Sequence, residues 1–377
     1  MSDITLNTAA AASPEAAPRQ PPATVVGPVA WVRANLFSGW ISTAVTLLLA
    51  YLLIRWAVGF VDWAFINAIW WVPDNQTQVC RDLHGTGACW AVITEKHRFI
   101  LFATYPYEEQ WRPAIVCLLF IALYAISAMR RFWRWELAVI WVVTLAVIAL
   151  LMWGGVFGLS YVSQERWGGL PITLILSTFG IAVAFPLAIL VALGRRSSMP
   201  AIRLLCIVYV ELIRGVPLIS LLFMASVMFP LFLPEGMNID KLLRAQIAII
   251  LFAGAYLAEV VRGGLQALSK GQYEAADALG LSYWKKTGLI VLPQALRLVI
   301  PPLVNTFIGF FKDTSLVLII GIFDLLTAAK TSVIEPAWQG FGVEVYITVA
   351  LVYFLFCFAM SRYSQRLEAE LNRHRRR

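Results

Sequence analysis

Long apolar stretches, separated by shorter polar segments, run along most of the sequence. Several are long enough to cross the apolar core of a bilayer as a helix, which takes about 20 residues. The pattern predicts eight spans, at about residues 38–60, 113–129, 136–158, 170–193, 204–232, 246–262, 296–324 and 344–361. We therefore expect an all-α integral membrane protein with about eight transmembrane helices.

The stretch 204–232 is longer than one crossing needs. It contains Glu211, Arg214 and Pro217, which are unusual inside a span. We expect its first part to lie along the membrane surface and Pro217 to begin the crossing. Within the third stretch, Gly154 and Gly158 form a small-xxx-small pair that could pack two helices closely.

Composition agrees with a membrane protein. The chain is 60% hydrophobic and only 14% charged, with a mean hydropathy of +0.75, whereas soluble domains carry about 25% charged residues. The formal net charge is +8. Because the basic residues lie in short loops beside apolar stretches, they indicate membrane topology, and nucleic acid is not an expected partner.

The basic loops predict the orientation of the chain. They contain Arg130, Arg131, Arg134; Arg195, Arg196, Arg203; Lys270, Lys285, Lys286; and Arg373, Arg375, Arg376, Arg377. With eight spans all four groups fall on one side, which the positive-inside rule makes cytoplasmic. Both termini are then cytoplasmic, the terminal arginines meet anionic lipid, and loop 61–112 lies outside. Residues 1–30, rich in Ala and Pro, read as a disordered cytoplasmic tail.

The cysteines and histidines offer little chemistry. Cys80 and Cys89 share the outer loop and could form a disulfide in an oxidising compartment, although two unpaired thiols are the alternative. The three histidines are scattered, which argues against a metal site. No set of nucleophile and base stands out either, so a membrane-embedded enzyme has little support.

The most informative polar segment is 271–293, GQYEAADALGLSYWKKTGLIVLP. It predicts a helix from about Tyr273 to Leu279, a turn at Gly280, and a second short helix through Ile290. Glycine can take the left-handed conformation that ends a helix. From periodicity alone this is either a cytoplasmic helix lying on the bilayer or an element that fits a groove in a soluble partner.

The same segment resembles the coupling-loop signature of ABC importer permeases, which is Glu-Ala-Ala, three residues, Gly, nine residues and Ile-x-Leu-Pro. Every spacing is met by Glu274-Ala275-Ala276, Gly280 and Ile290-Val291-Leu292-Pro293. The tripeptide alone would carry no weight, but the full pattern between two spans is specific.

Four neighbouring stretches resemble the permease subunits of polar amino acid ABC importers. They are 167–174 (WGGLPITL), 209–218 (YVELIRGVPL), 255–264 (AYLAEVVRGG), and 292–297 (LPQALR) leading into 311–316 (FKDTSL). Val216 stands where the family commonly has Thr. The resemblance covers about 167–370 and implies a five-helix type-1 importer core. Residues 31–166 would be a three-span extension, as in the general L-amino acid permease branch.

The resemblance implies a non-catalytic subunit. Partners would be a second related permease subunit or a second copy, two ATPase subunits, and a periplasmic amino acid binding protein, in a bacterial inner membrane. The chain has no Gly-Lys dipeptide and so lacks a phosphate loop; ATP would be used by the partners, and no cofactor is expected on this chain. Glu274, Ala275, Ala276 and Gly280 carry over as ATPase-coupling residues.

Ionisable and polar residues inside spans are candidates for the translocation path. Span seven contains Asn305, Thr306, Lys312, Asp313, Thr314 and Ser315. A lysine could face a substrate carboxylate and an aspartate its ammonium group. Alternatively, Lys312 and Asp313, or their neighbours, satisfy one another. For Glu259 with Arg262 and Glu211 with Arg214, structural ion pairs are the favoured interpretation.

A self-sufficient transporter driven by an ion gradient is the alternative function. Such folds often carry internal repeats, and we find none between the two halves of this sequence.

Overall fold

The computed structural model describes residues 27–72, 77–82, 85–237 and 239–372. Within them the secondary structure consists of helices and two isolated β-bridges. The chain forms two compact units, one of Met1–Ala68 with Gly85–Ala88 and one of Ile69–His84 with Cys89–Arg377.

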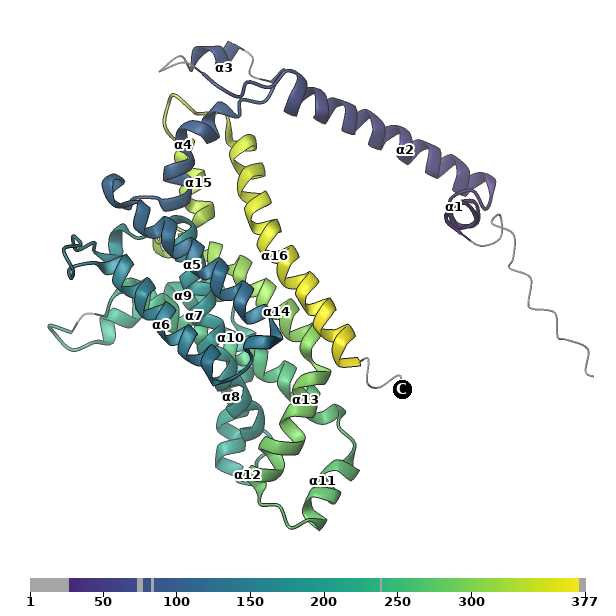
Figure 1. Cartoon of the computed structure of the whole chain (residues 1–377), viewed down its shortest axis with the longest axis vertical. Helices are drawn as coiled ribbons and strands as arrows, with labels where there is room; N and C mark the ends of the chain where they lie inside the picture. The colour runs from purple at the N-terminus through teal and green to yellow at the C-terminus, as the bar shows by residue number, and fades with distance from the viewer. Residues whose placement is uncertain (1–26, 73–76, 83–84, 238, 373–377) are drawn as a thin grey trace, which may run out of the picture. The chain divides into compact units, whose positions relative to one another are not determined.

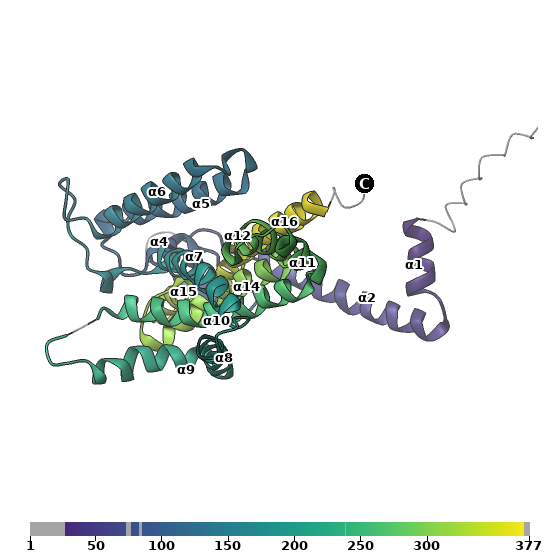
Figure 2. The same cartoon turned by 90° about the horizontal axis from the view of Figure 1, so that it is seen from below.

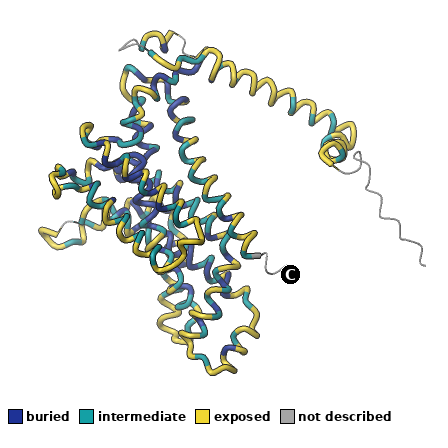
Figure 3. Tube along the Cα trace, in the orientation of Figure 1, coloured by how far each residue is buried: buried dark blue, intermediate teal, exposed yellow. Residues whose placement is uncertain are grey.

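The first unit contains α1 (Pro28–Leu36) and α2 (Trp40–Val61), which continues into a π-helical turn at Asp62–Ile66. No residue of α2 is buried in the chain itself, as its colour along the tube in Figure 3 makes plain. A helix that is apolar on all sides, yet packs against nothing in its own chain, is typical of a membrane span. Most of the predicted tail lies outside the described residues, but α1 begins at Pro28, so residues 28–30 are helical.

The second unit holds the remaining helices (Figure 1). They are α3 (Gln78–Asp82), α4 (Ala91–Phe102), α5 (Trp111–Ala128), α6 (Trp135–Trp153), α7 (Gly169–Gly194), α8 (Pro200–Gly215), α9 (Leu218–Phe223), α10 (Lys241–Ala267), α11 (Lys270–Ala278), α12 (Tyr283–Lys286), α13 (Leu292–Leu298), α14 (Ile300–Asp313), α15 (Leu325–Ser332) and α16 (Gly342–Asn372).

Eight membrane spans are confirmed in the described residues if one bent pair counts as a single span. Seven helical segments are long and apolar enough to cross a bilayer alone. The eighth is α8 followed by Leu218–Phe232, and the two parts meet at 103°. The bend follows Gly215 and coincides with Pro217, which has no N–H to continue the helix. The bend lies where the sequence predicted that the crossing begins, while a surface location for α8 stays a prediction.

The centre of the second unit is the contact between α7 and α10. Small residues permit it: a Cβ on Gly180 would lie 3.0 Å from Ile249 Cγ2, and one on Gly254 would lie 3.1 Å from Leu187 Cδ2. Close helix approach through small residues gives van der Waals contact inside a membrane, where the hydrophobic effect does not hold helices together.

The predicted role of Gly154 and Gly158 is wrong. Helix α6 ends at Trp153, and both glycines lie in the loop beyond it with positive φ angles of 65° and 79°. A Cβ on Gly154 would lie 2.1 Å from the Ser160 carbonyl oxygen, so glycine is needed there for a tight turn.

The region predicted as loop 61–112 contains the helix α4, which packs against α7 and α15. Helix α15 is capped by Asp324, whose carboxylate accepts hydrogen bonds from the Leu326 and Thr327 N–H groups. Burial raises the pKa of this carboxyl, although those hydrogen bonds favour its charged form.

Figure 1 places α4 and α15 at one end of the second unit and α11 and α12 at the other. Figure 2, seen along the unit, shows α5 and α6 side by side as a hairpin. Figure 3 shows buried residues gathered between these ends, while α11 and α12 are largely exposed.

Candidate functional site: the coupling segment and its charge network

The coupling segment, residues 271–293, folds as the sequence predicted, with two short helices and a turn between them. Helix α11 ends in a pair of hydrogen bonds, from Gly280 N–H to Asp277 O (2.9 Å) and from Leu281 N–H to Ala276 O (3.2 Å). This is the Schellman arrangement, which requires a left-handed residue after the helix. Gly280 has a φ of 67°, and no atom lies within 4 Å of where its Cβ would stand.

The outer surface of this segment is apolar and unpartnered within the chain. Leu279, Trp284 and Leu289 are 75%, 70% and 73% exposed. Glu274 and Ala275 are exposed beside them, whereas Ala276 is buried against the rest of the segment. Exposed apolar side chains with a carboxylate at the edge are what a helix-in-groove contact uses.

Polar contacts hold the segment in shape and join it to the bundle. Lys286 Nζ lies 2.5 Å from Asp277 Oδ1, and the Gln294 amide donates to Gln272 Oε1 at 2.9 Å. The loop after α7 supplies the third contact, since Arg196 donates to the Tyr273 hydroxyl (2.9 Å) and to the carbonyl oxygen of residue 265 (2.8 Å).

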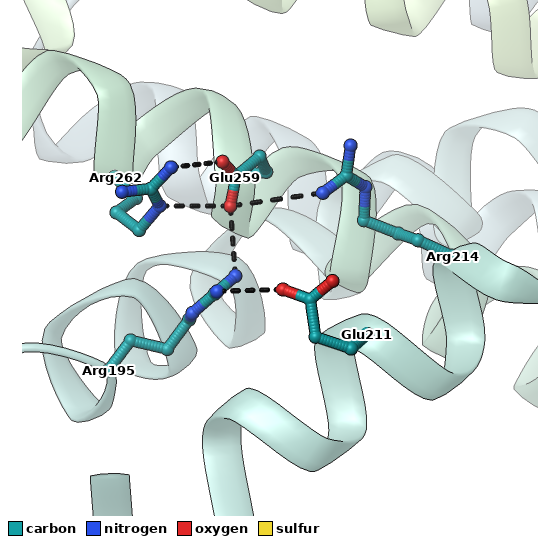
Figure 4. Close-up of polar contacts among 5 residues, drawn as sticks. All are labelled: Arg195, Glu211, Arg214, Glu259 and Arg262. Carbon is teal, nitrogen blue, oxygen red and sulfur yellow. Dashed lines mark hydrogen bonds and ion pairs between the residues drawn. The ribbon is translucent and has the colours of Figure 1, made fainter. Parts of the chain in front are cut away.

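A network of five charged side chains lies where α7, α8 and α10 meet (Figure 4). Its centre is Glu259, which accepts hydrogen bonds from Arg195 (2.9 Å) and from Arg262 Nε (2.9 Å). Arg195 also donates to Glu211 at 2.9 Å, and Arg214 approaches Glu259 to 4.0 Å. Because Arg195 and Arg196 are adjacent in sequence, one loop contacts both this network and the coupling segment.

The expected pair Glu259–Arg262 is confirmed, but the expected pair Glu211–Arg214 is wrong. Glu211 pairs with Arg195 from the end of α7, and the guanidinium of Arg214 lies over the Tyr256 ring at 5.4 Å. The network therefore joins α7, α8 and α10, in addition to the one pair of neighbours on α10.

The polar residues of span seven differ in exposure and in their hydrogen bonds. Asn305 and Lys312 are exposed and, seven residues apart, share one face of α14; Asp313 is half-buried. The hydroxyl groups of Thr306, Thr314 and Ser315 each donate to a carbonyl of their own helix, at 2.8 Å. No ion pair within 4.0 Å is found for Lys312 or Asp313 in the described part of the chain.

At the opposite end of the unit, Cys80 and Cys89 lie at disulfide-bonding distance. The Cys89 N–H donates to the buried carboxylate of Glu344 at 3.0 Å, and Lys96 pairs with Glu335 at 2.5 Å. These contacts fasten the outer loop to the start of α16 and to the connection that precedes it. Among the described residues no group of three or more His, Cys, Asp or Glu side chains could hold a metal ion.

Comparison with known proteins decides the family. Residues 184–373 match the family of binding-protein-dependent transport system inner membrane components, a range that includes the coupling segment and the charge network. The chain belongs to this family. It is thus a multi-pass permease subunit of the inner membrane, a class of protein that works with separate ATPase and substrate-binding subunits.

Similar permeases include two that match over nearly their whole length. The inner membrane amino-acid ABC transporter permease protein YhdY of Escherichia coli (strain K12) is 49% identical over 91% of this chain and 92% of its own. The glutamate/glutamine/aspartate/asparagine transport system permease protein BztC of Rhodobacter capsulatus is 38% identical over 96% and 97%. The L-cystine transport system permease protein TcyB of Bacillus subtilis is 35% identical, but this match spans 56% of our chain and 91% of TcyB.

Sequence reasoning missed Arg195 and Arg196 as partners of these groups. Their only signal was their place in a basic loop, which indicated topology. Cross-helix pairs of this kind depend on how α7, α8 and α10 are arranged, and no spacing within one helix can reveal them.

Proposed function

We propose that this chain is the permease subunit of an ATP-driven importer that carries L-amino acids across the bacterial inner membrane. The observation that carries the proposal is the complete coupling motif, folded as an exposed helix–turn–helix at one end of the bundle. The relatives YhdY and BztC, which match nearly the whole chain, are named as permeases for amino acids.

The coupling surface would contact a separate ATPase subunit. Leu279, Trp284 and Leu289 offer the apolar anchors and Glu274 a charge at their edge. Movement of the ATPase would be transmitted through Tyr273 and Arg196 to the loop that also holds Arg195, and through Arg195 to Glu259. Two ATPase subunits, a second permease subunit or second copy, and a periplasmic binding protein would complete the assembly.

The translocation path would run along the exposed polar face of α14. Asn305 and Lys312 share this face, and Gly309 between them leaves open space around its Cα. An unpaired lysine and a half-buried aspartate on one turn can accept the two charged groups of a zwitterion in sequence. Thr306, Thr314 and Ser315 would supply hydroxyl groups beside them.

In the proposed orientation the coupling segment and both termini lie in the cytoplasm. Two contacts support this for the coupling segment and the C-terminal helix, because they join basic loops to both. Arg196, after α7, contacts Tyr273 of the coupling segment, and Arg130, after α5, pairs with Glu370 near the end of α16 at 3.1 Å. The terminal arginines lie outside the described residues.

We assign residues 167–370 as the importer core and residues 31–166 as an extension with outer loop 61–112. The match to TcyB supports this division, since almost all of that protein aligns with little more than half of this chain. The extension would be fastened to the core at the outer end by the Cys89 N–H bond to Glu344 and by the Lys96–Glu335 ion pair, and the Cys80–Cys89 disulfide would brace the outer loop itself.

Affinity purification of the tagged chain from its native membranes tests the proposed assembly. We expect to recover an ATPase that has a phosphate loop, together with a second membrane subunit. Reproducible recovery of the chain alone, in a mild detergent and at several salt concentrations, would contradict the proposal and favour a self-sufficient transporter.

A further inference from the structure

A pocket of about 410 Å³ lies at the end of the bundle opposite the coupling segment. It is formed by the residues before α7, the start of α10 and the residues after the 3₁₀ turn 314–320. Helix α10 has 27 residues, so at 1.5 Å per residue the pocket and the coupling segment lie about 40 Å apart along it. Its volume lies in the range of small-molecule sites, about 300–1,000 Å³.

The inner wall of the pocket is apolar and fixed. Trp167, Ile172 and Ile322 line it and are buried. Trp167 is held by a hydrogen bond from its Nε1 to the Val162 carbonyl (3.3 Å) and by packing against the Trp153 ring at 4.9 Å. This wall offers apolar surface to an uncharged side chain.

The rim carries both signs of charge. Glu165, Asp240, Lys241 and Arg244 line it, which gives two carboxylates and two cations. The Asp240 carboxylate is already engaged, since its Oδ1 accepts from the N–H groups of Leu242 (2.8 Å) and residue 243 (3.3 Å) at the start of α10. For the other three rim residues, no ion pair within 4.0 Å is found in the part of the chain that the structure describes.

Arg244 provides the most direct indication of a ligand. It donates from Nη1 to the Ser226 carbonyl, but its enclosed Nε–H has no hydrogen-bond partner in the described residues. The Nε–H is closed off from the pocket, so the Nη donors that Ser226 does not use would hold a ligand. Such guanidinium donors suit a carboxylate, with which they form charge-assisted hydrogen bonds.

We propose that this pocket binds a free amino acid as a zwitterion before it enters the translocation path. The α-carboxylate pairs with Arg244 and Lys241, the α-ammonium group with Glu165, and the side chain lies on Trp167 and Ile172. The inference rests on the proposed function, and it adds to that function an acceptor site on the permease itself, separate from α14.

Protection from thiol labelling tests the proposal on the whole complex in nanodiscs. In a background without the free cysteines Cys117, Cys206 and Cys357, the variant Ile239→Cys places a thiol on the pocket wall and leaves the rim charges intact. The rate of its modification by a membrane-impermeant methanethiosulfonate is measured with L-glutamine or L-leucine. Isoamylamine and 4-methylpentanoate are the analogues of leucine that lack the carboxylate or the ammonium group.

We expect both amino acids to slow the labelling and both analogues to fail. Adding Arg244→Gln should raise the concentration needed for protection by about tenfold or more, because a charge-assisted hydrogen bond is lost. The matched change Lys330→Gln, an exposed cation outside the pocket lining, should leave protection unchanged. A thiol at Glu108→Cys, exposed and outside the lining, should react at the same rate with and without amino acid.

Two results would overturn the proposal. Labelling that neither amino acid slows, in a preparation that performs ATP-dependent uptake, would remove the pocket and leave the proposed function standing. Protection by ligand-free binding protein, without any by free amino acids, would assign the pocket to protein docking. If the complex without substitutions shows no ATP-dependent uptake, the proposed function is contradicted. Slower labelling in the presence of an amino acid would then still support the pocket as a binding site.

Discussion

Gly280 is the position where a single change should separate energy coupling from folding. Its φ of 67° lies in the left-handed region, and the Cβ of a larger residue would meet no atom within 4 Å. A substitution therefore costs conformational energy without a clash. For a residue other than glycine the left-handed conformation costs about 1–2 kcal/mol, and a β-branched side chain lies at the upper end of that range.

We predict that Gly280→Val weakens the turn between α11 and α12 enough to uncouple transport. A cost of about 1–2 kcal/mol changes an equilibrium constant by a factor of about 5–30. The two hydrogen bonds that end α11 depend on this turn. ATP-dependent uptake and substrate-stimulated ATP hydrolysis in proteoliposomes should therefore fall about fivefold or more, while the yield of membrane-inserted protein is unchanged.

Two matched variants separate the conformation from the bulk of the side chain. Asparagine tolerates the left-handed region, so Gly280→Asn should keep most of the activity. Gly288 also has open space around its Cα but lacks a positive φ, so Gly288→Val should be mild. Normal uptake in Gly280→Val, or equal losses in all three variants, would refute the reasoning.

Three further predictions follow from the site. Glu259→Gln should destabilise the permease by about 1–3 kcal/mol, because it weakens hydrogen bonds from two arginines to a side chain that is only 25% exposed. Thermal unfolding in detergent measures this, with Glu211→Gln, at 60% exposure, as a milder control. Cys80 and Cys89 should resist an impermeant thiol reagent until a reductant is added; reaction of both without reductant would exclude the disulfide. Lys312→Gln should slow uptake at saturating binding protein by about tenfold if it meets a substrate carboxylate, with assembly intact on purification; an unchanged rate would remove Lys312 from the path.

The hydrophobic pattern predicted the spans well because lipid offers no hydrogen-bond partners, so the backbone must form its hydrogen bonds within each helix. The bend at Pro217 and the turn at Gly280 were also predictable, since each depends on one residue with a restricted or permissive backbone. Periodicity missed α4 and α15, which are short and of mixed polarity. Their helical form is stabilised by packing against each other and by the Asp324 cap, which only the folded chain supplies.

The charge network illustrates a second limit. Glu211 was expected to pair with Arg214 because side chains three residues apart are neighbours on the surface of one helix. Arg195, from the end of another helix, takes that place. The pocket near α10 was missed for the same reason, because its lining comes from segments up to about 160 residues apart in the sequence.

The central claim is that ATP hydrolysed by partner subunits drives amino acid import through this permease. Its most direct test is uptake of radiolabelled L-amino acids into proteoliposomes that contain the purified complex and its binding protein, with ionophores abolishing the proton and sodium gradients. The account predicts uptake that requires ATP and continues without either gradient. Uptake that stops when the gradients are dissipated, with ATP still present, would contradict it.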